Sequence, residues 1–252
     1  MAGLGRSGAP RLRARALRRC VRGVVAALCL GLAGAGGAVA QIVEASYVQP
    51  VDRYHHDILG DTPEWGGMRL RLSDGRVLTI TLPESKIFED IAPRLVDVDG
   101  DGDAEVIAVE TSASLGARLT VWDETGVIAA TPNIGRRNRW LAPIGAADLD
   151  GDGKIEIAYI DRPHLARLLR VWRFDQGRLV LVAERDGLTN HRIGDAEIFS
   201  GLRDCGEGPR MVTVNRDWSR LMVSALAGGG IVTQDIGPYR GPASLRAALD
   251  CR

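Results

Sequence analysis

The chain lacks the short motifs that mark several common catalytic chemistries. It has no serine nucleophile elbow, no HExxH metal motif and no glycine-rich phosphate-binding loop. Its His55-His56 pair has no cysteine or spaced histidine beside it, which makes a transition-metal site a weak prediction. Low-complexity and linker-like stretches are absent after residue 41, so residues 41–252 are expected to form a single domain.

Long apolar runs are also scarce, apart from one near the start. Residues 1–40 carry seven arginines and no acid, then an apolar run at 24–32, then Ala38-Val39-Ala40. This order is typical of a cleavable signal peptide, and it predicts a periplasmic or secreted protein. An uncleaved anchor is the alternative, although the run is short and glycine-rich for a bilayer span. The choice between Sec and twin-arginine export stays open.

An excess of basic residues is missing as well. The full chain has 32 basic and 32 acidic residues, and without residues 1–40 it has 25 basic and 32 acidic ones. An acidic domain disfavours a nucleic-acid partner, which would need a basic face. Only two of the four cysteines, Cys205 and Cys251, lie beyond the predicted signal peptide. An even pair in an exported protein predicts a disulfide.

What the chain does contain is an acidic segment that occurs twice. Residues 97–105 and 148–156 each place acids at positions 1, 3, 5 and 9 of a glycine-containing loop that leads into an apolar strand. Carboxylates on alternate residues repel one another, and a hard cation such as Ca²⁺ removes that repulsion. An EF-hand is disfavoured, because position 12 is Ala108 or Tyr159 and not the required glutamate.

Four hairpins repeat with the same spacing as the acidic segments. The two segments are 51 residues apart, and the turn glycines Gly75, Gly126, Gly177 and Gly229 are spaced by 51, 51 and 52 residues. The hairpin arms alternate apolar and polar residues, which is typical of strands. A period of this length indicates a propeller or a solenoid.

The second acidic segment, together with Ala147, resembles the calcium loop of FG-GAP/VCBS-type β-propeller repeats, the kind also found in integrin α-chain propellers. That motif is Asp-x-Asp-x-Asp-Gly-x-x-Asp, with a backbone carbonyl at position 7. The resemblance extends over residues 60–235 and implies a fold and two structural Ca²⁺ sites, but no reaction. Position 9 is glutamate in both loops, where aspartate is commoner. The implied side-chain ligands are Asp97, Asp99, Asp101, Glu105, Asp148, Asp150, Asp152 and Glu156, with the carbonyls of Asp103 and Lys154.

These features predict an all-β fold, most simply a small β-propeller with four blades of four antiparallel strands. In the second blade we expect strands at 92–96, 105–110, 118–123 and 126–131, and in the third at 143–147, 155–160, 168–174 and 178–183. The first blade lacks an inner strand, and residues 243–248 of the C-terminal tail are expected to supply it. The Cys205–Cys251 bond would then hold the ring closed. A short helix in the tail, five blades or an open arrangement are the alternatives.

A third copy of the acidic segment has lost its ligands. If Arg203 takes position 1, Cys205, Glu207 and Met211 fall at positions 3, 5 and 9. Only one acidic ligand remains, so we predict no calcium in this loop.

The loops opposite the acidic segments gather arginine, histidine and tryptophan. Loops from several blades commonly form a binding site, where arginine suits carboxylate or phosphate and tryptophan can stack on a sugar. The structural alternative is that these residues form Arg–Asp pairs and pack between sheets. The candidate ligand-binding residues are Arg136, Arg139, Trp140, Asp161, His164, His191, Arg192 and Trp218.

The sequence therefore predicts an exported, calcium-binding β-propeller that serves as a binding or interaction module for a protein or carbohydrate. The alternative is a small carbohydrate-active enzyme, a polysaccharide lyase or hydrolase, with Asp161 and His164 or Asn190 and His191 as its polar pair. No residue is assigned a catalytic role.

Overall fold

The computed structural model describes residues 40–252. The predicted signal peptide therefore lies outside the described residues, except for Ala40. The elements are β1 (Ile42–Val51), β2 (Glu64–Leu72), β3 (Val77–Thr81), β4 (Lys86–Phe88), β5 (Arg94–Val96), β6 (Glu105–Ser112), β7 (Gly116–Trp122), β8 (Val127–Ala130), β9 (Leu141–Ala147), β10 (Glu156–Asp161), β11 (Leu168–Asp175), β12 (Arg178–Asp186), β13 (Leu188–Thr189), β14 (Gly201–Asp204), β15 (Pro209–Asn215), β16 (Arg220–Ala227), β17 (Gly230–Pro238) and α1 (Pro242–Leu249). Within this part of the chain, no helix is both long and apolar enough to span a membrane.

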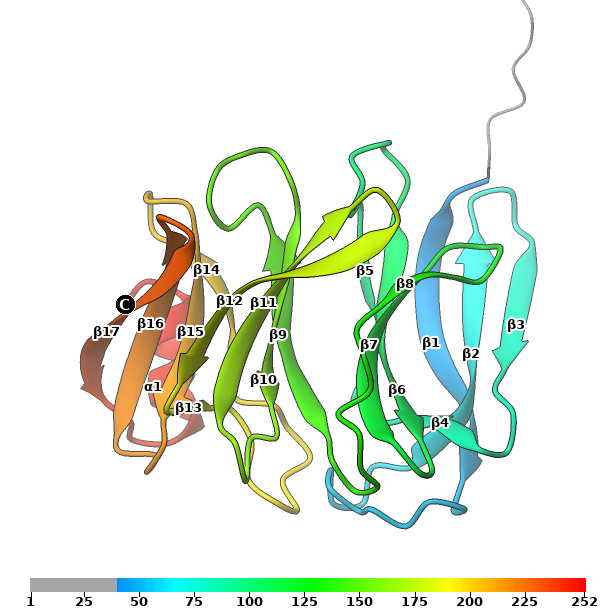
Figure 1. Ribbon diagram of the computed structural model, residues 1–252, viewed down its shortest axis with the longest axis horizontal. Helices are drawn as coiled ribbons and strands as arrows, with labels where there is room; N and C mark the ends of the chain where they lie inside the picture. The colour runs from blue at the N-terminus through cyan, green and yellow to red at the C-terminus, as the bar shows by residue number, and fades with distance from the viewer. Residues whose placement is uncertain (1–39) are drawn as a thin grey trace, which may run out of the picture. The chain divides into compact units, whose positions relative to one another are not determined.

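The strands form three antiparallel sheets that follow one another in chain order (Figure 1). We call β1–β3 the first unit, β5–β8 the second, β9–β12 the third and β13–β17 the fourth. The short strand β4 pairs with both β2 and β6, and so joins the first and second units into one sheet. The predicted all-β fold is confirmed. All eight strands predicted for the second and third blades are present, with small differences at their ends.

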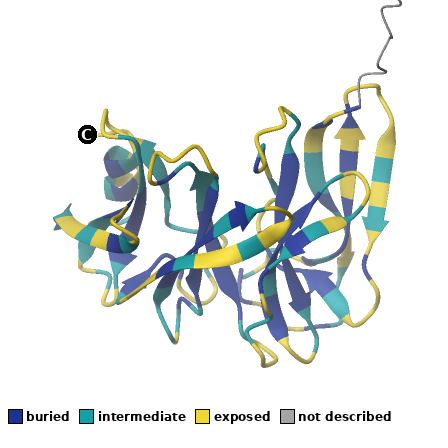
Figure 2. Cartoon of the chain, turned by 45° about the horizontal axis from the view of Figure 1, so that its top comes forward, coloured by how far each residue is buried: buried dark blue, intermediate teal, exposed yellow. Residues whose placement is uncertain are grey.

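Side-chain alternation on the inner strands builds the cores between neighbouring sheets. On β6, Val106 packs with Met68 of the first unit, whereas the next residue, Ile107, packs with Ile157 of the third. These inner strands are buried on both faces, while outer strands such as β3 and β12 alternate or are largely exposed (Figure 2). The units therefore stack face to face, as successive blades would.

The C-terminal tail does not form the predicted closing strand. Residues 242–249 form the helix α1, with proline in its first turn and good helix formers after it. Leu245 and Ala248 pack on Val212 and Val214 of β15, so the helix covers the outer face of the fourth unit. Among the described strands, none of β13–β17 pairs with β1–β3. The predicted closure by the tail is wrong, and four-blade closure is not shown.

Instead, the first and fourth units meet through their loops. The amide of Gly194 donates a hydrogen bond to the carbonyl of Ile58, at 3.2 Å. Gly60 lies so close to this segment that a Cβ there would stand 2.6 Å from the carbonyl oxygen of Gly194. The loop between β1 and β2 thus reaches across to the segment that follows β13.

The predicted Cys205–Cys251 disulfide is present, with 5.8 Å between the Cα atoms. Its place in the fold differs from the expectation. Cys205 follows β14 and Cys251 follows α1, so both ends belong to the fourth unit and its helix. The bond fastens the helix to its own sheet and does not link the first unit to the fourth.

Candidate functional site

The first acidic loop, residues 97–105, is folded around its own carboxylates. Asp97 accepts hydrogen bonds from the amides of Gly100 and Gly102, at 2.7 and 3.1 Å. Both glycines have positive φ, which a residue with a side chain adopts poorly. Carboxylate oxygens of Asp97, Asp99 and Asp101 lie within 4.8 Å of one another. This all-oxygen set has the chemistry that Ca²⁺ prefers.

Glu105 completes the first loop from the start of β6. Its Oε2 accepts a hydrogen bond from the amide of Val98 at 2.8 Å. Burial, followed by the charges of Asp99, Asp101 and Asp97, raises the pKa of Glu105 from 4.5 to about 7. A bound cation would offset the repulsion that these acidic neighbours exert on the Glu105 carboxylate, so these residues fit calcium. Gln41 adds a hydrogen bond from its amide nitrogen to the Asp103 carboxylate.

The second acidic loop, residues 148–156, repeats this backbone arrangement. Asp148 accepts from Gly151 and Gly153 at 2.7 and 2.9 Å, and Glu156 accepts from Leu149 at 2.9 Å. Asp148, Asp150 and Glu156 place oxygens within 4.8 Å of one another. The two predicted loops thus share one local structure, as their sequences imply.

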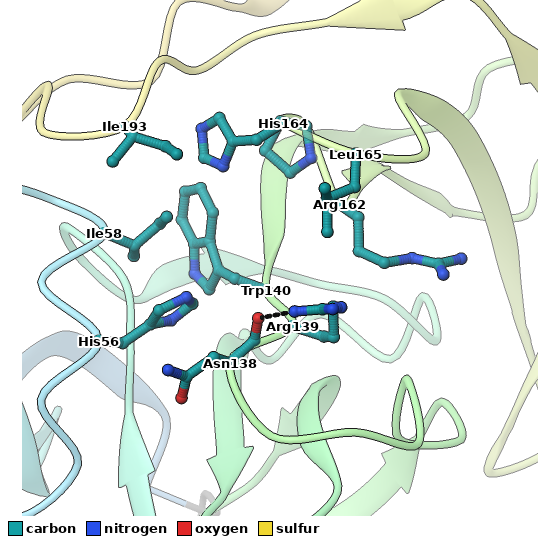
Figure 3. A pocket seen from close by; sticks show the side chains of 10 residues that line it. His56, Ile58, Asn138, Arg139, Trp140, Arg162, His164, Leu165 and Ile193 are labelled. Carbon is teal, nitrogen blue, oxygen red and sulfur yellow. Dashed lines mark hydrogen bonds between the residues drawn. The ribbon is translucent and has the colours of Figure 1, made fainter.

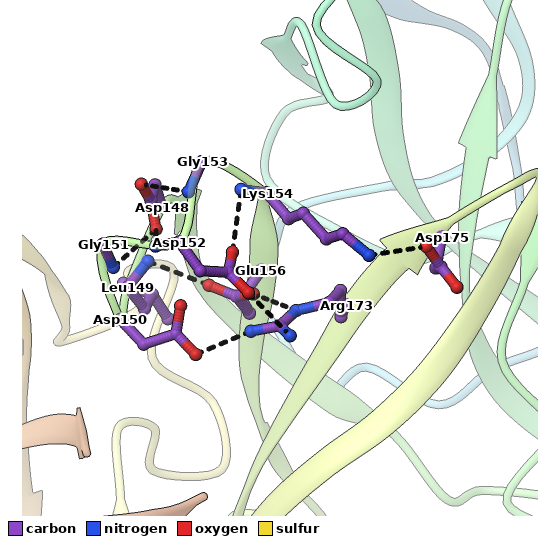
Figure 4. A network of polar contacts seen from close by, with 10 residues as sticks. All are labelled: Asp148, Leu149, Asp150, Gly151, Asp152, Gly153, Lys154, Glu156, Arg173 and Asp175. Atoms are coloured by element: carbon purple, nitrogen blue, oxygen red, sulfur yellow. Dashed lines mark hydrogen bonds and ion pairs between the residues drawn. The ribbon is translucent and has the colours of Figure 1, made fainter. Parts of the chain in front are cut away.

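The second loop already holds a cation from its own chain. Arg173 of β11 reaches into the loop with all three guanidinium nitrogens (Figure 4). Nε lies 2.5 Å from Glu156 Oε1, Nη2 lies 2.6 Å from Asp150 Oδ2, and Nη1 lies 3.0 Å from Asp152 Oδ2. Hydrogen bonding to Glu156 contributes most to a raised pKa of Arg173. Arg173 was not among the residues predicted from the sequence, although it follows Trp172 just as Asp123 follows Trp122.

Lys154 of the second loop points outward and is bound elsewhere. Its Nζ lies 2.9 Å from Asp175 Oδ1, while its amide donates to Asp152 Oδ1 at 2.9 Å. The predicted calcium ligand from Lys154 is its backbone carbonyl, and its side-chain amine takes no part in the acidic cluster.

A cleft of about 290 Å³ lies among the loops at the other ends of the strands (Figure 3). Its walls come from the β1–β2 loop, the segment before β9, the β10–β11 loop and the segment after β13. The residues that line it are His56, Ile58, Asn138, Arg139, Trp140, Arg162, Pro163, His164, Leu165 and Ile193. Loops of the first, third and fourth units therefore converge here.

Trp140 forms the floor of this cleft and is 2% exposed. Its indole Nε1 donates to the carbonyl of Glu89 at 2.7 Å. The ring of His164 stacks on the indole at 6.5 Å between centroids, and the ring of His191 meets it edge-on at 4.9 Å. Such burial leaves little of the indole free to stack on a sugar.

The two histidines beside Trp140 are joined by a hydrogen bond of 3.0 Å between His164 Nε2 and His191 Nδ1. Burial, with smaller effects of His191, His56 and Arg167, lowers the pKa of His164 from 6.5 to about 4. Burial also lowers the pKa of His191. Both rings are neutral near pH 7, so neither adds positive charge to the cleft.

The remaining predicted ligand residues lie apart from the cleft lining. Asp161 is buried and paired with Arg162 and Arg170, at 2.8 and 3.3 Å. The Arg192 guanidinium lies 4.1 Å from the ring centroid of Trp218, which packs on the aromatic residues of the fourth unit. Arg136 is exposed and does not line the cleft.

A scan against protein families matches residues 97–159 to the FG-GAP-like repeat. The match begins at the first acidic loop and runs through the second into β10. The chain contains an FG-GAP-like repeat. No curated protein matches the chain.

Among solved structures, the chain is similar to the crystal structure of exotype rhamnogalacturonan lyase YesX. The two share 18% sequence identity over 79% of this chain and 47% of that chain, with a TM-score of 0.47. This chain thus spans about half the length of that lyase. A likeness of this degree supports no conclusion about activity.

Beyond the FG-GAP-like repeat, the third loop keeps only part of the pattern. With Arg203 at position 1, the carboxylate of Asp204 at position 2 binds the two glycine amides instead: its Oδ1 accepts from Gly206 and Gly208, at 2.8 and 3.1 Å. The strand register agrees with the predicted alignment on Arg203, because Leu202 lies opposite Met211 just as Val96 lies opposite Glu105 and Ala147 lies opposite Glu156. The loop is shorter, because Asp204 already pairs with Pro209 at the start of β15.

A histidine–glutamate pair at the cleft was not predicted from the sequence. Nδ1 of His56 lies 2.5 Å from Glu89 Oε1, and Glu89 Oε2 accepts from the Thr111 hydroxyl at 2.7 Å. Glu89 is 2% exposed, and burial raises its pKa while the hydrogen bond from His56 opposes that rise. The residues are 33 positions apart, so only the fold brings them together.

Proposed function

We propose that the protein is a calcium-stabilised binding module of the β-propeller type, whose ligand lies in the cleft above Trp140. The observation that carries the proposal is the convergence of four loop segments from three units around one cleft of about 290 Å³. Sites built from several loops on a rigid scaffold are the usual binding sites of such folds.

The chemistry of the cleft favours a small ligand with an apolar face and a carboxylate. Leu165 and Ile193 line the cleft and are 57% and 71% exposed, so they offer an apolar surface to a ligand. Arg139 also lines the cleft, and within residues 40–252 its side chain donates one hydrogen bond, from Nη1 to the carbonyl of Asn138 at 2.8 Å, so most of its donors are free for an anion. Arg162 is held by Asp161 and contributes less. Acidic saccharides are one class of ligand with these properties.

Binding to paired neutral and uronic-acid oligosaccharides tests this proposal. We expect the acidic member of each pair to bind more tightly, and Arg139→Gln to lose that preference with an unchanged melting temperature. Arg136→Gln is the matched control, since Arg136 belongs to the same segment but lies outside the cleft. The assignment would be contradicted if Arg139→Gln and Arg136→Gln bound the acidic oligosaccharide equally well, or if the wild type did not prefer the acidic oligosaccharide to the neutral one.

Calcium in this proposal stabilises the fold and does not contact the ligand. All ligands of the FG-GAP-type motif come from one loop, and these loops lie at the opposite strand ends from the cleft. Metal binding to a folded loop adds directly to folding stability. A thermal melt with calcium and with EGTA tests this, and an unchanged melting temperature would contradict it. The disulfide is consistent with an oxidising compartment, and we propose a periplasmic or secreted location.

The His56–Glu89 pair supports a second candidate, a small polysaccharide lyase or hydrolase. A buried carboxylate that holds one nitrogen of a histidine leaves the other nitrogen suited to proton transfer. His56 also lines the cleft, as a general base must. Release of unsaturated products (a lyase) or of new reducing ends without unsaturation (a hydrolase) from an acidic polysaccharide, abolished by His56→Gln and kept by His55→Gln, would favour the enzyme. Retained ligand binding without any product would favour the binding module.

A further inference from the structure

We propose that the second acidic loop, residues 148–156, is closed by the guanidinium of Arg173 and takes no calcium. Of the two acidic loops, only residues 97–105 would then bind the ion, in contrast to the two sites that the repeat motif implies. The assignment of Arg173 rests on the contacts within the second loop. The expected number of one calcium ion per chain also rests on the proposed calcium binding of the first loop.

Arg173 occupies the oxygens that calcium would need. Its three nitrogens bind the acids at positions 3, 5 and 9 of the motif, which are three of the four side-chain ligands. Calcium requires such oxygens at about 2.3–2.6 Å from a single point. The ion would therefore have to break two charge-assisted hydrogen bonds and a third ion pair, and then lie beside a positive guanidinium, which loses no proton at ordinary pH.

The backbone keeps Arg173 at this place. Arg173 is directly opposite Glu156 in the pairing of β10 with β11, and its side chain is 20% exposed. The guanidinium is thus supplied by the same sheet that supplies Glu156. The guanidinium is part of the chain and is always present at the loop. A calcium ion must bind from solution, and its occupancy depends on the free calcium concentration.

The first loop has an acid where the second has Arg173. The pairs Val106–Trp122 and Ile157–Trp172 are equivalent in their sheets, so Asp123 takes the position of Arg173. Its Oδ1 accepts from the amides of Thr125 and Gly126 and so shapes the β7–β8 turn. Within residues 40–252, no lysine or arginine forms an ion pair with the acids of the first loop. The first loop still needs a cation, and the second does not.

The number of calcium ions per chain tests the inference, measured by equilibrium dialysis of the EGTA-treated, desalted protein against calcium chloride. We expect one ion in the wild type and two in Arg173→Gln, because that change frees the second loop. Two matched variants change position 5 of each loop. Asp101→Asn should lose the ion of the wild type, and Asp152→Asn should keep it.

Several results would overturn the inference. A wild type that binds two ions, one of them lost in Asp152→Asn, would show that Arg173 yields to calcium. An Arg173→Gln variant that folds and binds no more ions than the wild type would show that the guanidinium is not what excludes the metal. If that variant does not fold, equal losses in Asp101→Asn and Asp152→Asn would decide against the inference. A wild type without calcium would refute the metal assignment of the first loop, and Arg173→Gln should even then gain one ion.

Discussion

Replacing Arg173 by glutamine should destabilise the calcium-free protein by an amount that the structure allows us to estimate. Glu156, the partner of Arg173 Nε, has a side chain that is 0% exposed. Removing one member of a buried ion pair costs about 3–5 kcal/mol, because the other charge stays buried. The pairs with Asp150 and Asp152, 27% and 40% exposed, add about 0–1 kcal/mol each.

Glutamine can still donate one hydrogen bond to Glu156, which recovers about 1 kcal/mol. We therefore expect a net loss of about 3 kcal/mol in EGTA. For a domain of this size this corresponds to a fall in melting temperature of about 6–12 °C. Thermal unfolding followed by circular dichroism in EGTA measures it. Calcium at about 100 times its dissociation constant should bind the second loop of the variant and raise the free energy of unfolding by about 2.7 kcal/mol.

Arg71→Gln is the matched control, since Arg71 pairs with Glu44 on the surface and the two side chains are 52% and 59% exposed. We expect it to change the free energy of unfolding by less than about 1 kcal/mol. If Arg173→Gln behaves like Arg71→Gln, Glu156 does not depend on the guanidinium, and the reasoning about the second loop is wrong.

Three further changes test other parts of the structure. In EGTA, the stability of the wild type should fall as pH rises from about 4.5 to 7, because the folded state keeps a proton on Glu105 that the unfolded state releases; a pH series of melts measures this, and Glu105→Gln should have a shallower slope. Replacing Cys205 and Cys251 together by serine should cost about 4 kcal/mol, since the bond closes a loop of 46 residues; urea unfolding without reductant tests it, and a loss below 1 kcal/mol would contradict it. Gly60→Ala should cost more than Gly75→Ala in a thermal melt, because both glycines have positive φ but only at Gly60 would a Cβ meet a backbone carbonyl of the fourth unit, at 2.6 Å; equal losses would show that this loop contact carries no stability.

The parts of the fold set by local pattern were predictable from the sequence. Alternating apolar residues and turn glycines located the strands of the second and third units, because each hairpin is fixed by neighbours within a few residues. The two acidic loops were also predictable, because the hydrogen bonds that shape each loop join residues close together in the sequence. The disulfide followed from the cysteine count.

The parts of the structure that depend on long-range contacts were not predictable from the sequence. Closing a ring of four blades predicts a strand in the C-terminal tail, whereas the residues of the tail favour the helix that forms. His56 meets Glu89 only because the β1–β2 loop folds back toward the end of β4. Arg173 lies opposite Glu156 in the pairing of β10 with β11. The pairing of a strand residue with a loop 17 positions away nevertheless depends on register, which single-strand patterns do not give.

The strand β4 affects how this chain could change in evolution. Repeat proteins gain and lose whole units when a coding segment is duplicated or deleted, provided that each unit carries its own complete sheet. Here Phe88 pairs with Trp65 of the first unit and with Glu110 of the second. Deleting the first unit together with β4 would leave β6 without a partner along part of its length, as an edge open to wrong association. The first two units must therefore be kept or lost as one piece, while the third unit, with its own four-stranded sheet, is free of that restriction.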